Sequence, residues 1–304
     1  MTKHSFGGQW TFIKLEVLKR YLEFFNTALQ NQPNPNNPFS RVYIDAFAGT
    51  GECEVKLDDG TPSTISGSAK IAIETSPEFH QIHLIDLNPK HVAELQRLGN
   101  GAARIKIHEE DANSALEKII SQITWRNTRG VLFLDPYGMA ARWQTLERIA
   151  ATEALDLWYL FPISAVCRQA ANDFSKIDEH KAAALDNVLG TTEWRTAFYE
   201  KSNQDSLIEG ALPTMQRIAN PTQIATYVHI RLSAIFKGWV SPPIFLPENG
   251  SPMFVLFFAV SNPSEAAVKL SKKAAEHLFN MLKTKKIGSL HASKLPSENQ
   301  PGLF

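Results

Sequence analysis

The sequence is poor in cysteine. Of its 304 residues only Cys53 and Cys167 are cysteines, and they do not form a CxxC pair. This scarcity argues against a disulfide framework and against a cysteine-based zinc site, so we expect no metal. It is also typical of a reducing compartment. Residues 1–10 lack the apolar core of an export signal, and we therefore expect a cytoplasmic protein.

An excess of charge of one sign is lacking too, because 31 lysines and arginines balance 31 aspartates and glutamates. No global field draws the protein to a polyanion, so nucleic-acid binding would need a local basic patch. The sequence also lacks long apolar runs. The most apolar one, at 253–260, is too short to span a bilayer, and we expect no membrane partner.

What the chain does contain is a series of short apolar runs that alternate with helical patterns. The runs lie at 42–47, 82–85, 104–108, 131–134 and 155–161, and the helical patterns at 10–30, 67–75, 89–98, 112–123 and 141–151. This alternation predicts a parallel sheet covered by helices on both faces. In such a sheet ligands bind beyond the carboxyl ends of the strands.

The C-terminal part adds a predicted hairpin, because Asn249-Gly250 separates apolar runs at 240–246 and 253–260. Five parallel strands plus a terminal hairpin predict the Rossmann-like α/β fold of class I methyltransferases, with a mostly parallel seven-stranded sheet. We divide the chain into an N-terminal helix and connector (1–40), a cofactor-binding core (41–163), a helical substrate or partner insertion (164–238), a hairpin and helix that complete the core (239–282), and a tail (283–304).

The first apolar run ends in Asp45-Ala-Phe47-Ala-Gly49-Thr-Gly51. Glycines let the backbone turn tightly and let a ligand approach it without a Cβ in the way. We assign Asp45, Phe47, Gly49 and Gly51 to cofactor binding; a packed glycine turn is the structural alternative. The nicotinamide fingerprint GxGxxG is not completed, because Glu54 stands at its last position, which argues against a dehydrogenase.

The second and third runs also end in acids. Asp86 can accept both ribose hydroxyls of a bound nucleoside, or it can cap the next helix. Asn88 is the better cap because it directly precedes a proline, which leaves Asp86 available. Asp111 can accept the exocyclic amine of adenine, and capping by Asp111 or Asn113 is the alternative.

The fourth run ends in Asp135-Pro136-Tyr137-Gly138. A carboxylate at the end of a buried strand, followed by a proline and an aromatic ring, indicates a substrate site. Arg168 follows the fifth run closely and can hold a phosphate or carboxylate of the substrate. A salt bridge from Arg168 to one of the strand-end acids is the alternative.

Residues 52–66 delay the helix that normally follows the glycines. We interpret them as a small hairpin with Asp59-Gly60 at its turn. This hairpin lies over the mouth of the cofactor site or else decorates the surface.

These residues together resemble the three-Cys-motif partner protein family, a branch of class I methyltransferase-like proteins. The resemblance covers most of residues 6–270 and runs through FGGQWT at 6–11, Lys14-Leu15, Tyr21-Leu22, YIDAFAGTG at 43–51, Gly67-Ser68, DPYG at 135–138 and FFAVSNP at 257–263. It implies S-adenosylmethionine as cofactor and a functional partnership with a radical enzyme that carries a three-cysteine cluster motif.

Asp135-Pro136-Tyr137 also resembles the Asn/Asp-Pro-Pro-aromatic motif of methyltransferases that act on exocyclic amines of bases. There the side-chain oxygen and a backbone carbonyl accept the two N–H bonds, and the aromatic ring stacks on the base. This chain has a single proline, and Gly138 follows the tyrosine. We therefore expect a methyltransferase acting on a nucleic acid or nucleotide-like substrate. The alternative is a non-catalytic S-adenosylmethionine-binding partner of the radical enzyme.

Overall fold

The computed structural model describes residues 9–56, 62–202, 214–246 and 251–283. Several predicted features lie outside these residues: the start of the resemblance at 6–8, the turns at Asp59-Gly60 and Asn249-Gly250, and nearly all of the C-terminal tail.

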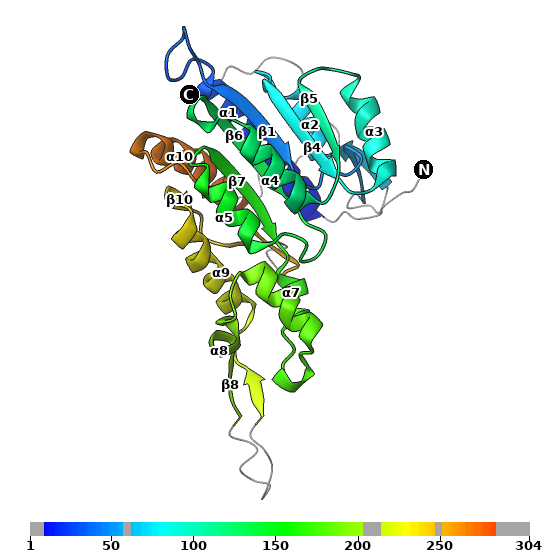
Figure 1. Ribbon diagram of the computed structural model, residues 1–304, viewed down its shortest axis with the longest axis vertical. Coiled ribbons are helices and arrows are strands. Elements are labelled where there is room, and N and C mark those ends of the chain that lie inside the picture. The colour runs from blue at the N-terminus through cyan, green and yellow to red at the C-terminus, as the bar shows by residue number, and fades with distance from the viewer. Residues whose placement is uncertain (1–8, 57–61, 203–213, 247–250, 284–304) are drawn as a thin grey trace, which may run out of the picture.

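A mostly parallel sheet forms the centre of the molecule (Figure 1). Its parallel strands are β1 (Ser40–Asp45), β4 (Gln81–Asp86), β5 (Ile105–Glu109), β6 (Thr128–Leu134) and β7 (Leu155–Phe161). The antiparallel strand β12 (Phe254–Val260) lies beside β7. The order across the sheet, starting from β10 (Trp239–Val240), is β10-β12-β7-β6-β1-β4-β5. The predicted Rossmann-like α/β fold, with a mostly parallel sheet and antiparallel strands from the C-terminal part, is confirmed.

The predicted strand at 240–246 is two short strands, so the sheet has eight strands among the described residues rather than seven. These are β10 (Trp239–Val240) and β11 (Ile244–Leu246), and both pair antiparallel with β12. Pro242 and Pro243 lie between them, and proline has no N–H group to donate to a ladder.

Helices cover both faces of the sheet. A hydrophobic cluster on one face includes side chains from α1 (Gln9–Leu29), α2 (Ser68–Glu74), α3 (Pro89–Gly99) and α10 (Glu265–Lys283). The cluster on the other face includes side chains from α4 (Ala112–Gln122) and α5 (Trp143–Ala151). Every residue of β7 is buried, which explains why the strand is apolar apart from Asp156. In the described part of the chain, no helix is both long enough and apolar enough to cross a membrane.

The helical insertion extends away from the sheet (Figure 1). It contains α6 (Ile163–Gln169), α7 (Glu179–Leu189), α8 (Trp194–Phe198), α9 (Pro221–Ile235) and the 3₁₀ turn η2 (Phe174–Lys176). The sequence did not predict its small antiparallel hairpin of β8 (Tyr199–Lys201) and β9 (Met215–Arg217). Gly190 ends α7 against the core, because a Cβ placed there would lie 2.0 Å from the Trp143 ring.

The segment after the glycine turn forms the predicted hairpin, with β2 (Glu52–Lys56) antiparallel to β3 (Pro62–Ser66). Its base is closed by a hydrogen bond from Gly67 N to Gly51 O at 2.8 Å. Val55 is 2% exposed, and β2 contacts α1. The hairpin is therefore packed on the core. A further 3₁₀ turn, η1 (Trp125–Asn127), precedes β6.

Candidate functional site

The chain reverses its direction across the sheet at β1. From β1 it continues to β4 and β5 on one side, and then returns to β6 and β7 on the other. Ligands of open α/β sheets bind in the crevice outside the carboxyl ends of the strands at such a point. Asp45 ends β1, Asp86 ends β4 and Asp135 directly follows β6. Asp111 follows β5, which pairs with β4, so all four predicted acids lie at the carboxyl ends of neighbouring strands.

Asp45 is completely buried. Its carboxylate accepts hydrogen bonds from Tyr43 Oη at 3.0 Å, from Phe47 N at 3.3 Å and from the Ser68 side chain. Burial raises the pKa of Asp45 to about 6, and the nearby charge of Asp135 adds to this effect. Through its hydrogen bond with Phe47 N, Asp45 therefore holds the start of the loop that follows β1.

The glycine turn depends on left-handed backbone, with φ +62° at Gly49 and +81° at Gly51. A Cβ on Gly49 would meet no atom of the described residues within 4 Å, so this side of the turn is open to a ligand. A Cβ on Gly51 would instead lie 2.6 Å from Leu98 Cδ2 of α3. The missing Cβ of Gly51 thus makes room for α3, while Gly49 borders the open space. Cofactor binding by Gly51 stays a prediction.

Asp86 is 6% exposed, and neighbouring groups use most of its acceptor capacity. It accepts from Gly49 N at 3.0 Å and from Asn88 N at 2.8 Å, and His91 Nδ1 lies 3.1 Å from Oδ2. The prediction that Asn88 caps α3 is confirmed. Asp86 is nevertheless not free, because it ties the glycine turn to the start of α3. Beside it, Leu87 is 69% exposed and presents an apolar surface that the sequence analysis overlooked.

Asp111 caps α4, as the alternative interpretation held. Its Oδ1 accepts from both N and Oγ of Ser114, each at 3.2 Å. Oδ2 has no hydrogen-bond partner within the described residues, so the adenine contact stays a prediction. Asn113, the other candidate cap, makes its hydrogen bonds elsewhere.

Asp135 forms an ion pair with Lys14 Nζ. The side chains of Asp135 and Lys14 are only 21% and 12% exposed, respectively. Lys14 lies in the helical pattern predicted at 10–30 and in the Lys14-Leu15 segment of the resemblance, which gives it no role. Nothing in the local pattern indicates that this lysine reaches a residue 121 positions away.

Tyr137 is 66% exposed, and its ring lies edge-to-face against Phe47 with 6.2 Å between ring centroids and 82° between planes. Partial burial and the carboxylates of Asp86 and Asp135 raise the pKa of its hydroxyl. Pro136 is buried beside it, and Gly138 has a φ of +57°. The loop after β6 thus presents an aromatic ring next to the strand-end acids.

Cys53 of β2 also borders this group. Burial raises the pKa of its thiol, the charge of Lys14 lowers it, and the charges of Asp135 and Asp45 raise it further. The hairpin of β2 and β3 therefore lies beside the strand-end acids, which agrees with the predicted position over the site mouth. The sequence analysis gave Cys53 no role because it lacks a nearby cysteine or histidine partner in the chain.

Arg168 is exposed in the last turn of α6. It forms no salt bridge with any described residue, so the structure does not contain the ion pair to a strand-end acid that was the alternative. Its role in substrate binding stays a prediction.

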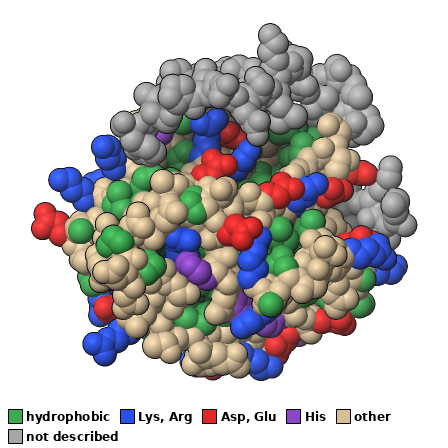
Figure 2. All heavy atoms as spheres, turned by 90° about the horizontal axis from the view of Figure 1, so that it is seen from above, with side chains coloured by type: hydrophobic (Ala, Val, Ile, Leu, Met, Phe, Trp, Pro, Cys, Tyr) green, Lys and Arg blue, Asp and Glu red, His purple; other side chains and the backbone are tan. Residues whose placement is uncertain are grey.

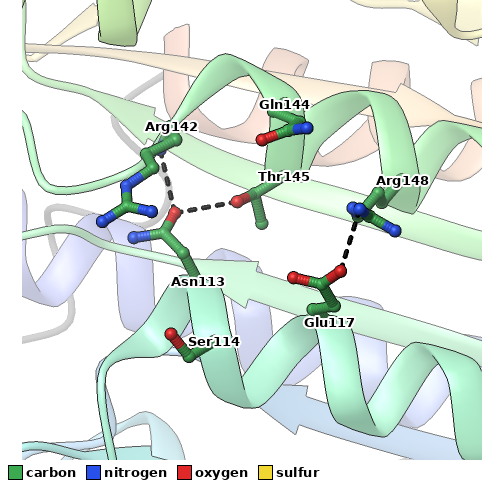
Figure 3. A pocket seen from close by; sticks show the side chains of 7 residues that line it. All are labelled: Asn113, Ser114, Glu117, Arg142, Gln144, Thr145 and Arg148. Carbon is green, nitrogen blue, oxygen red and sulfur yellow. Dashed lines mark hydrogen bonds and ion pairs between the residues drawn. The ribbon is translucent and has the colours of Figure 1, made fainter.

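A small polar pocket lies between α4 and α5, beside the loop that carries Asp135 (Figure 3). Asn113, Arg142 and Thr145 are among the residues that line it, and none of the predicted site residues does. Within the described ranges, no three histidine, cysteine, aspartate or glutamate side chains gather in a way that could hold a metal ion.

No family model matches the chain, and no curated protein matches its sequence. Among solved structures, it is similar to a Legionella pneumophila protein of the family DUF519, with 14% identity over 90% of this chain and 94% of that one and a TM-score of 0.46. It is also similar to an S-adenosylmethionine-dependent methyltransferase from Clostridium acetobutylicum (12% identity, 80% and 91% covered, TM-score 0.34). It is similar as well to the N-methyltransferase NodS from Bradyrhizobium japonicum, with 8% identity over 81% of this chain and 97% of that one and a TM-score of 0.31.

At these identities and scores, any functional assignment depends on the residues of the site itself. The charge distribution adds one observation. On the face seen in Figure 2, acidic and basic side chains are interspersed and no area of one sign stands out. This agrees with the equal numbers of positive and negative residues.

Proposed function

We propose that the protein is an S-adenosylmethionine-dependent methyltransferase that acts on an exocyclic amine of a nucleic acid or nucleotide-like substrate. The observation that carries this proposal is the ion pair between Lys14 Nζ and Asp135. The lysine nitrogen stands in for an acceptor amine, because both donate N–H bonds to a carboxylate. Tyr137 lies next to this position with most of its ring exposed, as stacking on a base requires.

The residues around the glycine turn fit the adenosyl part of S-adenosylmethionine. The open side of Gly49 admits a ligand close to the backbone, and Leu87 offers an apolar surface beside Asp86. Asp86 Oδ1 accepts a hydrogen bond from Asn88 N, and a carboxylate oxygen can accept a second from a ribose hydroxyl. Asp111 Oδ2 would accept the adenine amine. When bound, the cofactor supplies a sulfonium methyl group.

Asp135 is the group that acts on the acceptor. Its carboxylate accepts an N–H bond of the amine and so directs the nitrogen lone pair toward the methyl carbon. Methyl transfer to the amine would release S-adenosylhomocysteine and a proton from the nitrogen, and the carboxylate of Asp135 would accept this proton. Lys14 must leave the carboxylate before the amine can take its place. The structure therefore predicts that acceptor binding separates Lys14 from Asp135.

The same ion pair favours a second candidate function. Because Lys14 already neutralises Asp135, the protein would be a non-catalytic S-adenosylmethionine-binding partner of a radical three-Cys-motif enzyme if the pair never opens. In that case the helical insertion, which extends away from the sheet, provides surface for the partner.

Incubation with tritiated S-adenosylmethionine and total nucleic-acid, protein and small-molecule fractions tests the proposal. We expect label in the nucleic-acid or nucleotide fraction with the wild-type protein and none with Asp135→Asn. Asp178→Asn is the control, because Asp178 caps α7 in the helical insertion. The second candidate is supported if calorimetry shows that the protein binds the cofactor but no fraction becomes labelled, even when the radical enzyme is added. Absence of cofactor binding overturns both.

A further inference from the structure

The side chain of Asn113 connects two parts of the candidate site. It is 8% exposed and lies in the first turn of α4, two residues after Asp111. Its Nδ2 donates to the carbonyl oxygen of Ala140 at 2.9 Å. Its Oδ1 accepts from Arg142 N at 3.0 Å and from Thr145 Oγ1 at 2.8 Å, as Figure 3 shows.

All three partners belong to one short stretch of chain. Ala140 and Arg142 lie in the loop that begins with Asp135 and leads into α5, and Thr145 lies in the first turn of that helix. Asn113 therefore holds the far end of the loop whose near end carries Asp135 and Tyr137. The near end has its own attachment, because Lys14 contacts Asp135.

Only an amide side chain satisfies this set of partners. A carbonyl oxygen needs a donor, whereas a backbone N–H and a hydroxyl need an acceptor, and asparagine supplies both. Aspartate would place a carboxylate against the carbonyl of Ala140, and leucine would remove all three hydrogen bonds, of which the one to Thr145 Oγ1 is buried. The residue type thus matches its position in the loop contact and not helix capping, which Asp111 performs.

We propose that Asn113 is a positioning residue that fixes the loop 135–142 relative to the start of α4, so that a ligand bound at Asp111 also orders Asp135 and Tyr137. The second part rests on the proposed function, because it assumes that an adenosyl group occupies the strand ends. The first part, the attachment of the loop, does not. Asn113 touches neither cofactor nor acceptor and acts through the loop.

Hydrogen–deuterium exchange, resolved for peptides that cover 135–146, tests both parts in the full-length protein. The variants are Asn113→Leu and, as matched control, Asn26→Leu. Asn26 is also a buried asparagine that holds a loop, since its Nδ2 donates to Pro77 O at 2.7 Å, but it does so at the amino end of the sheet. Both variants lose a buried amide, and we expect both to lower the melting temperature.

Asn113→Leu should speed exchange in 135–142 by roughly tenfold or more, because hydrogen bonds that hold the loop are lost. Asn26→Leu should leave these peptides at the wild-type rate. Thr145→Val removes only one of the three hydrogen bonds, so it should give a smaller increase in the same peptides and remains informative if Asn113→Leu fails to fold. Loop exchange that is unchanged in Asn113→Leu or Thr145→Val, or equally fast in Asn26→Leu, overturns the attachment.

S-adenosylhomocysteine serves as the probe for the second part. In the wild-type protein it should slow exchange in 135–142. In Asn113→Leu the loop should no longer respond, and the dissociation constant should rise by about the factor by which the ligand slows loop exchange in the wild type, because coupling is reciprocal. Methyl transfer at saturating cofactor should then show a lower kcat. A loop that responds equally in both proteins overturns the coupling. If the wild-type protein does not bind the probe, the proposed function fails, and exchange without ligand still decides the attachment.

Discussion

Asp45 and Asp156 are two buried carboxylates at opposite ends of the sheet, and their electrostatics are nearly the same. Burial raises the pKa of each to about 6. Each accepts a hydrogen bond from a tyrosine hydroxyl: Tyr43 donates to Asp45 at 3.0 Å, and Tyr21 donates to Asp156 at 2.5 Å. Asp45 ends β1, whereas Asp156 is the second residue of β7.

Their surroundings differ. Asp45 lies beneath the glycine turn and close enough to Asp135 to feel its charge. Asp156 is covered by α1 and α10, and Ser271 of α10 donates to it at 3.3 Å. A raised pKa alone therefore does not locate a functional site, because a contact between helices and sheet produces the same shift. The position at the strand ends, the open side of Gly49 and the exposed Tyr137 distinguish the two regions.

The sharpest test of this difference compares Asp135→Ala with Asp156→Ala. If the carboxyl ends of the strands carry the chemistry, Asp135→Ala should lower methyl transfer by roughly 10²- to 10⁴-fold, since it removes the group that orients and deprotonates the amine. Its cofactor affinity should be unchanged. Asp156→Ala should lower the melting temperature but keep transfer at permissive temperature. Full transfer by Asp135→Ala would show that the strand-end carboxylate is not part of the reaction.

The pH dependence of stability tests the similarity of the two carboxyls. Each has a pKa of about 6 in the folded protein against an ordinary value of 3.8, so each binds its proton more tightly when folded. The free energy of unfolding should therefore fall as pH rises from about 4 to about 6, by up to about 3 kcal/mol per group.

His83 opposes this trend, because burial lowers its pKa to about 4 and stability should rise with pH across the same interval. Urea unfolding at a series of pH values should show a shallower fall in Asp156→Asn and a steeper one in His83→Gln. An Asp156→Asn curve parallel to that of the wild type would contradict the assigned cause.

Asp86→Ala should affect binding and stability together, unlike either of the preceding carboxyls. We expect adenosyl binding to weaken by about 1.5–3 kcal/mol, the range for hydrogen bonds to a charged group. If Asp86 only bound the ribose, its replacement would leave the melting temperature of the ligand-free protein unchanged. Because Asp86 also accepts from Gly49 N and Asn88 N, we expect a lower melting temperature without ligand as well. Calorimetry and thermal unfolding measure the two effects, and unaltered binding would reduce Asp86 to a scaffold residue.

The smallest effect is expected for Tyr137→Ala. Substrate binding should weaken by about 1 kcal/mol, at the lower end of values for base stacking on an aromatic ring. The melting temperature should hardly change, because the side chain is 66% exposed. A marked loss of stability would place Tyr137 with the scaffold and not with the site. Titration of the wild-type protein and of Tyr137→Ala with substrate measures the difference in affinity.

Much of the fold and part of the candidate site were predictable from local patterns. The alternating runs predicted all five parallel strands and placed Asp45, Asp86 and Asp135 at strand ends, whereas the order of the strands came from the structure. The β8–β9 pair was missed because strands of three residues carry too little periodicity. The division of 240–246 into two strands follows from Pro242-Pro243, because proline cannot donate a hydrogen bond to the ladder.

The sequence by itself determined the layered α/β fold, the order of the acids and the left-handed glycine turn, because these follow from side-chain periodicity and from the conformations open to glycine. Only the tertiary structure decided the partners of these groups. Lys14 meets Asp135 across 121 positions, and Asn113 reaches Ala140 across 27. Such pairs depend on how α1, α4 and the loop after β6 pack around the sheet. Local residue patterns do not predict that packing, because it joins segments that are distant in the sequence.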